Sequence, residues 1–110
     1  MTSPVDTLER LSKTLSLRKG ANPEESYTAK LFAKGEDAIL KKIGEECAEL
    51  IIASKGHTKS EIIYEAADVF YHILVLLEFN AIGINEVLQE LERREGVSGV
   101  VEKNSRTAPK

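Results

Sequence analysis

Apolar residues recur at intervals of three and four along most of this chain, with charged residues between them. This spacing is typical of amphipathic helices, and strand-like alternation is not found. The first run comprises Val5, Leu8, Leu11 and Leu15. Ser3 followed by Pro4 predicts the start of its helix, because serine caps free amides and proline fits the first turn. We expect this helix to end near residues 18–20 and to be followed by a loop over residues 20–23.

Two further helices are predicted in the first half of the chain. Ser26 is expected to cap a short helix over residues 27–32, which breaks at Lys34-Gly35. Asp37 is expected to cap the next helix, and Gly56 is expected to follow its end in the left-handed conformation that glycine favours. One broad apolar face of this helix comprises Ile39, Leu40, Ile43, Cys47, Leu50 and Ile51.

The next predicted helix is apolar nearly all round. It opens at Thr58-Lys59-Ser60-Glu61, which has the form of a capping box, and runs to Phe79. A helix of this kind is normally covered on several sides, and a chain of 110 residues has few helices to cover it. We therefore expect a homodimer or a larger even oligomer.

Gly83 marks a turn before a last amphipathic helix over residues 85–94. Residues 97–110 are expected to be a loose C-terminal tail. The pattern thus predicts one all-α domain over residues 1–96, built from four or five helices, that forms a helical-bundle homodimer.

Composition and charge exclude several classes of protein. The net charge of −3 gives no general attraction to nucleic acid, and the apolar stretches are too short and interrupted to span a bilayer. One cysteine permits neither an intrachain disulfide framework nor a multi-cysteine zinc site. The N-terminal residues lack the basic-then-apolar order of a secretory signal, so we expect a cytoplasmic protein without nucleic-acid or membrane partners.

Five carboxylates form two short clusters in these helical segments, Glu45, Glu46 and Glu49 in the first and Glu65 and Asp68 in the second. On a helix, residues three or four apart project from one side, so two antiparallel helices could direct four or five carboxylates to one point. Isolated buried carboxylates are costly, and oxygen ligands without paired His or Cys favour magnesium or manganese. The alternative is that these residues line solvated helix faces. The joint pattern favours a metal site, because the second cluster lies in the most apolar helix.

Other candidate residues carry weaker signals. Lys30, Lys34, Lys41 and Lys42 could contact phosphate or could simply be solubilising surface residues. His72 follows Asp68 by four residues and could hydrogen-bond to it or approach a substrate, although a packed core histidine is the preferred interpretation. The pattern contains no Glu-x-x-His pair for a di-iron site, no EF-hand loop and no glycine-rich phosphate loop.

Several segments together resemble a known family. Glu-Glu-x-x-Glu, followed after fifteen residues by Glu-x-x-Asp, resembles the signature of the all-α nucleoside-triphosphate pyrophosphatases, the MazG-like superfamily. Within it, the chain is similar to the phosphoribosyl-ATP pyrophosphohydrolase family over roughly residues 8–94. The segments that carry this similarity are Ser26-Tyr27-Thr28-Ala29-Lys30-Leu31, Lys41-Lys42-Ile43-Gly44-Glu45-Glu46, Tyr64-Glu65-Ala66-Ala67-Asp68 and Tyr71-His72-Ile73-Leu74-Val75-Leu76-Leu77.

The resemblance implies magnesium-dependent hydrolysis of phosphoribosyl-ATP to phosphoribosyl-AMP and pyrophosphate in a helical dimer, the second step of histidine biosynthesis. By position, Glu46, Glu49, Glu65 and Asp68 match the metal-binding carboxylates, and Glu45 matches an additional acidic residue. Glu45 and Glu49 are the candidates for orienting water. Two alternatives remain at this point: a house-cleaning nucleoside-triphosphate pyrophosphatase and a non-catalytic helical dimerisation module.

Overall fold

The computed structural model describes residues 4–96, 99–100 and 103–104, and no strand occurs in this part of the chain. The elements in chain order are η1 (Pro4–Asp6), α1 (Thr7–Arg18), α2 (Tyr27–Lys34), α3 (Glu36–Gly56), α4 (Lys59–Phe79) and α5 (Ile84–Arg94). The all-α class predicted from the apolar spacing is therefore confirmed. Ser3 and most of the predicted tail at 97–110 lie outside the described residues.

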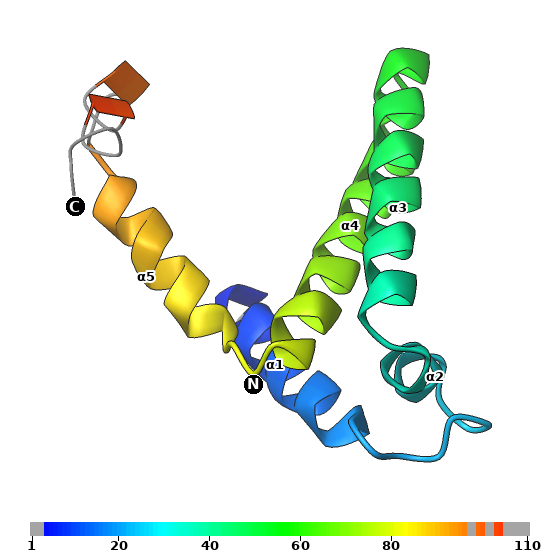
Figure 1. Ribbon diagram of the computed structural model, residues 1–110. Coiled ribbons are helices and arrows are strands. Elements are labelled where there is room, and N and C mark those ends of the chain that lie inside the picture. The colour runs from blue at the N-terminus through cyan, green and yellow to red at the C-terminus, as the bar shows by residue number, and fades with distance from the viewer. Residues whose placement is uncertain (1–3, 97–98, 101–102, 105–110) are drawn as a thin grey trace.

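The two longest helices, α3 and α4, form an antiparallel hairpin that positions the site. Each has 21 residues, and a two-residue connection joins them, so they run back along each other. Figure 1 shows this hairpin projecting away from α1, α2 and α5. The hairpin therefore brings residues of α3 opposite residues of α4 that lie far along the sequence.

The hydrophobic core lies where the second half of α4 meets α1, α2, α3 and the start of α5. Its fully buried side chains are Leu15, Ile39, Leu74 and Val75, joined in one cluster by Leu31 and Ile84. Burying an aliphatic side chain of this size stabilises the fold by about 1.5–3 kcal/mol. The core therefore anchors one end of the α3–α4 hairpin.

The first half of α4 is much more exposed than its apolar sequence predicts for a single chain. Ile63 and Tyr64 in this half are 58% and 66% exposed, and Phe70, just past the midpoint, is 60% exposed. The expectation that α4 is covered on several sides is thus correct only for its second half, because the first half packs mainly against α3 within this chain.

The start of α2 follows the prediction, but the start of α3 does not. The Ser26 hydroxyl accepts a hydrogen bond of 3.1 Å from the Ala29 amide, which confirms Ser26 as the cap of α2. Asp37 is not the cap of α3, because the helix already begins at Glu36 and Gly35 precedes it. Gly35 has φ 96°, a conformation that permits the chain to turn directly from α2 into α3.

The turn between α3 and α4 also differs from the sequence expectation. α3 continues through Gly56, so the left-handed residue is His57, with φ 60°. Thr58 does precede α4, but among the described residues its hydroxyl makes no hydrogen bond that caps the helix. The predicted capping box is therefore wrong. The first backbone hydrogen bond of α4 is donated by the Ile62 amide to the Thr58 carbonyl, over 3.0 Å.

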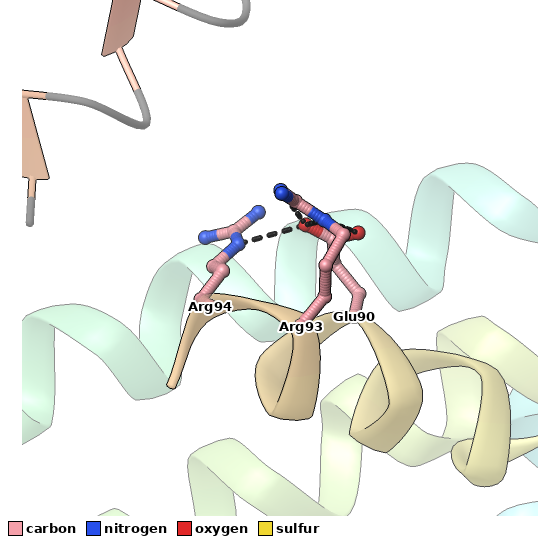
Figure 2. A network of polar contacts seen from close by, with 3 residues as sticks. All are labelled: Glu90, Arg93 and Arg94. Atoms are coloured by element: carbon pink, nitrogen blue, oxygen red, sulfur yellow. Dashed lines mark hydrogen bonds and ion pairs between the residues drawn. The ribbon is translucent and has the colours of Figure 1, made fainter. Parts of the chain in front are cut away.

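The last helix, α5, begins at Ile84, one residue before the prediction, and the Glu86 carboxylate accepts from the Gly83 amide at 3.1 Å. Figure 2 shows that Arg93 and Arg94 both contact Glu90 on this helix, with nitrogen–oxygen distances of 2.7 and 2.9 Å. Hydrogen bonds from the two guanidinium groups lower the pKa of Glu90 to about 2. All three side chains are about half exposed, so solvent screens these ion pairs and they add little stability.

No single helix of the described residues is long and apolar enough to cross a membrane. Among the described residues, only the pair of α4 and α5 is long and apolar enough when both helices are counted together. The two helices are bent by 114° at their junction.

Candidate metal centre

Three of the predicted carboxylates converge between α3 and α4. Glu46 and Glu49 lie one helical turn apart on α3, and Glu65 approaches them from α4. One oxygen from each of the three carboxylates lies within 4.8 Å of the others. The three-residue spacing and the antiparallel hairpin together produce this convergence.

Two carboxylate oxygens of this cluster are buried and lack hydrogen-bond partners among the described residues. Glu46 is only 5% exposed. Oε2 of Glu46 and Oε2 of Glu65 are both buried and have no hydrogen-bond partner among the described residues. An unpaired buried carboxylate oxygen is costly, and a cation would satisfy both atoms. The donor set contains only oxygen, which fits a hard divalent ion such as magnesium.

The surroundings of Glu65 favour its protonated form when no cation is bound. Burial is the largest cause that raises the pKa of Glu65 above its ordinary value of 4.5. The charge of Glu49, a hydrogen bond to it, and the charges of Asp68 and Glu46 raise this pKa further. Like charges therefore crowd this point of the hairpin.

Asp68 adjoins the three convergent carboxylates but is not one of them. Its charge acts on Glu65, and its backbone carbonyl accepts a hydrogen bond of 2.8 Å from Nδ1 of His72. His72 is 4% exposed, so the interpretation as a packed core histidine agrees with its position.

Glu45 lies apart from the convergent group, in a cavity that the lysines share. This cavity has a volume of about 330 Å³ and is lined by Tyr27, Leu31, Lys34, Ala38, Lys41, Lys42 and Glu45. We call it the lysine cavity. Lys30, the remaining lysine of the predicted phosphate-binding set, is exposed and does not line it.

Lys42 connects the lysine cavity to the carboxylates. Its Nζ lies 3.3 Å from Oε1 of the buried Glu46. The hydrogen bond to Glu46 is the main cause that raises the pKa of Lys42, which keeps the ammonium charged. A positive charge is thus held at the edge of the acidic cluster.

A second cavity, of about 440 Å³, lies on another side of the same carboxylates. It is lined by Glu49, Ile52, Ala53, Ser60, Glu61, Tyr64 and Glu65. The carboxylates are therefore bordered by one cationic cavity and by one whose walls include exposed apolar residues such as Ile52 and Tyr64.

Sequence reasoning missed Tyr27 as a site residue. Its ring is half exposed and lines the lysine cavity, and its hydroxyl lies 3.1 Å from Nε2 of the buried His72. The four-residue spacing of Asp68 and His72 was a local signal for part of this arrangement. The contact with Tyr27 spans 45 residues and had no such signal.

Known proteins match this chain over most of its length. A model of the phosphoribosyl-ATP pyrophosphohydrolase family matches residues 8–95. A phosphoribosyl-ATP pyrophosphatase of Dechloromonas aromatica is 59% identical, over 92% of this chain and 94% of that protein. One of Nitrosomonas eutropha is 50% identical, over 97% and 92% of the two chains.

A longer relative carries the same unit. The histidine biosynthesis bifunctional protein HisIE of Wolinella succinogenes is 58% identical over 90% of this chain, but the match covers only 43% of that protein. The matching region corresponds to the domain that holds the convergent carboxylates and the lysine cavity. This chain belongs to the phosphoribosyl-ATP pyrophosphohydrolase family.

Proposed function

We propose that this chain hydrolyses phosphoribosyl-ATP to phosphoribosyl-AMP and pyrophosphate, a step of histidine biosynthesis. The family match over residues 8–95 and the names of relatives that are 50–59% identical support this activity. The observation that best supports metal-assisted hydrolysis is the convergence of Glu46, Glu49 and Glu65. Glu46 and Glu65 each contribute one buried oxygen that has no hydrogen-bond partner among the described residues. A helical module that served only for dimerisation would have no need of such a cluster.

The carboxylates are proposed to hold magnesium, with manganese as the closest substitute. Glu46, Glu49 and Glu65 would supply the convergent oxygens, and Asp68, which adjoins Glu65, would complete the set. When bound, such an ion neutralises charge on phosphate oxygens and lowers the pKa of a bound water.

Glu49 and Glu45 are the two candidates for orienting the attacking water. Glu49 is exposed and borders the larger cavity, so its carboxylate can accept a hydrogen bond from water there. Glu45 lies among the lysines of the smaller cavity. We favour Glu49, because its carboxylate belongs to the convergent group.

The lysines are proposed to bind the phosphate of the phosphoribosyl group. Lys34, Lys41 and Lys42 line one cavity and can direct ammonium donors at a single phosphate. This group is absent from ATP, so it is the part of the substrate that can distinguish the two nucleotides. We expect Lys30 to contribute less, because it lies outside the cavity.

A second copy of the chain is the proposed cover for the exposed face of the hairpin. Ile51, Ile52, Ile63, Tyr64 and Phe70 are exposed large apolar residues of this hairpin, and each Leu- or Phe-sized side chain that becomes buried stabilises an assembly by about 1.5–3 kcal/mol. Ile52 and Tyr64 also line the cavity beside Glu49, so a partner there would separate the carboxylates and the water that Glu49 orients from bulk solvent. We therefore propose a homodimer or a larger even oligomer in the cytoplasm, with neither nucleic acid nor membrane as partner. A monomer by sedimentation at micromolar concentration would contradict this assembly.

The activity is tested by assaying purified protein with phosphoribosyl-ATP and with a panel of ordinary, deoxy and altered nucleoside triphosphates. We expect kcat/KM for phosphoribosyl-ATP to exceed that for ATP by at least about a hundredfold, the equivalent of about 2.7 kcal/mol. Equal efficiency on ATP, or preference for deoxynucleotides, would instead assign the chain to house-cleaning pyrophosphatases. Absence of turnover on every nucleotide would favour a dimerisation module.

A further inference from the structure

Two consecutive residues at the start of α2 contact two consecutive residues of α4. The Tyr27 hydroxyl is hydrogen-bonded to Nε2 of His72, and the hydroxyls of Thr28 and Tyr71 are hydrogen-bonded to each other. Both tyrosine rings lie edge-on to the His72 ring, with centroid distances of 6.0 and 5.5 Å. These contacts connect the helix that carries Lys34 to the helix that carries Asp68.

The direction of the hydrogen bonds at His72 follows from the chemistry of its partners. The Asp68 carbonyl can only accept, so Nδ1 of His72 must carry the proton that it donates over 2.8 Å. In the neutral ring Nε2 is then an acceptor, and the Tyr27 hydroxyl donates to it. The phenolic oxygen of Tyr27 is left as an acceptor for a cationic donor.

Such a donor is close by, because Tyr27 and Lys42 line the same cavity. Burial is the main cause that raises the pKa of Tyr27, and the positive charge of Lys42 opposes that effect. Lys42 in turn contacts Glu46 at 3.3 Å. Direct contacts therefore join the Asp68 backbone to His72 and Tyr27, and Lys42 to Glu46, and the wall of the lysine cavity relates Tyr27 to Lys42.

We propose that Tyr27 and His72 form a positioning pair that fixes the lysine cavity relative to the carboxylates of α3 and α4. A phosphomonoester bound by Lys34 and Lys42 then lies at a defined distance from those carboxylates. This inference rests on the proposed function in one respect, which is that the phosphomonoester is the ribose phosphate of the substrate. In this proposal Tyr27 positions Lys42, which binds the phosphate, and His72 positions Tyr27.

The test compares Tyr27→Phe with Tyr71→Phe. Each variant loses one hydroxyl that joins α2 to α4 and keeps its ring, but only Tyr27 lines the lysine cavity. We expect Tyr27→Phe to raise KM for phosphoribosyl-ATP about tenfold with a much smaller change in kcat. Tyr71→Phe should leave KM near the wild-type value, and thermal unfolding should show that both variants are folded.

A second readout does not depend on turnover. Binding of ribose 5-phosphate, measured by calorimetry in the presence of EDTA, should weaken about tenfold in Tyr27→Phe and remain unchanged in Tyr71→Phe. Magnesium affinity should be the same in both variants. Failure of the wild type to hydrolyse phosphoribosyl-ATP would count against the proposed function only, because this binding experiment still tests the pair.

Substitution of His72 supplies a rescue experiment. Asn at this position can retain the donation to the Asp68 carbonyl but does not reach Tyr27, whereas the longer Gln can place an amide oxygen near the position of Nε2. We expect His72→Asn to bind ribose 5-phosphate as weakly as Tyr27→Phe does, and His72→Gln to recover much of the affinity. Equal losses in Tyr27→Phe and Tyr71→Phe, or wild-type affinity in Tyr27→Phe, would overturn the proposal.

Discussion

The Ser12 hydroxyl on α1 donates a hydrogen bond of 2.7 Å to Oε1 of Glu78 on α4, and both residues are buried. This contact joins the first helix of the domain to the anchored end of α4. It lies apart from the convergent carboxylates, so it should affect folding without affecting their chemistry.

Ser12→Ala is expected to lower the free energy of unfolding by about 1–3 kcal/mol, because it removes a partner of a buried carboxylate. Denaturant unfolding measures this change. Ser16→Ala, on the exposed side of the same helix, should change stability by less than about 0.5 kcal/mol. Equal stability of the two variants would show that water replaces the lost hydroxyl.

Glu65→Gln is expected to remove part of the pH dependence of stability in metal-free protein. The folded-state pKa of Glu65 is raised above 4.5, so the folded chain keeps a proton that the unfolded chain has already lost in the range just above that value. The unfolding free energy should therefore decrease as pH rises through this range, and the contribution should become constant above the folded-state pKa.

Urea unfolding of wild type and Glu65→Gln in EDTA, from about pH 4 to about pH 7, tests this sign. The wild type should lose more stability than the variant as pH rises. Saturating magnesium should raise the melting temperature of the wild type, because it binds only the folded state, and should reduce this loss. Parallel curves for the two proteins without metal would contradict the prediction.

Glu49→Gln and Asp68→Asn should each reduce kcat/KM at least about a hundredfold, the equivalent of about 2.7 kcal/mol. Both changes remove a charged oxygen and preserve side-chain size, so the fold should be retained. Glu92→Gln, an exposed position on α5, is the charge-matched control and should behave like wild type. Calorimetric titration with magnesium should show weaker binding in the first two variants alone. Near-normal rates in those variants would refute these residue assignments.

Lys34→Ala should weaken use of phosphoribosyl-ATP by about 1–3 kcal/mol, the range for a hydrogen bond from a charged group. Lys30→Ala should have a smaller effect, because Lys30 does not line the lysine cavity. Lys55→Ala, in the last turn of α3, controls for the loss of one positive charge. The measurement is kcat/KM, and a greater loss in Lys30→Ala than in Lys34→Ala would place the phosphate elsewhere.

Gly35→Ala should destabilise the fold by about 1–3 kcal/mol, because φ 96° is strained for a residue with a Cβ. Among the described residues, no atom beyond the two chain neighbours of Gly35 lies within 4 Å of the added Cβ, so the cost comes from the backbone alone. Gly44→Ala, inside α3, has the same open space and should stabilise the helix by up to about 1 kcal/mol. Thermal unfolding of the pair separates the two effects.

Much of the fold was predictable, because helical periodicity is a local property of the sequence. The convergence of Glu46, Glu49 and Glu65 was predictable for a related reason. Residues three apart share a helix side, and a short connection makes neighbouring helices antiparallel. The position of Asp68 beside this group rather than within it depends on details of helix rotation that the spacing does not specify.

The features that escaped prediction depend on non-local geometry or on backbone conformation. The Tyr27–His72 contact requires α2 to be placed against α4, which the loop after α1 and the core packing determine. Asp37 is of a residue type that often caps helices, but α3 begins earlier, at Glu36, directly after Gly35. The exposure of Ile63 and Phe70 could not be predicted from the sequence, because large apolar residues occur in both halves of α4 and their type does not say which of them are covered within one chain.

The contrast between the two halves of α4 implies that one helix evolves under two kinds of selection. At Leu74 and Val75, substitutions are limited by the packing of the chain against itself. At Ile63 and Phe70, the single chain imposes no such limit, so any restriction there must come from assembly or catalysis. A comprehensive substitution library scored once for abundance and once for growth without histidine should therefore divide this helix near its midpoint.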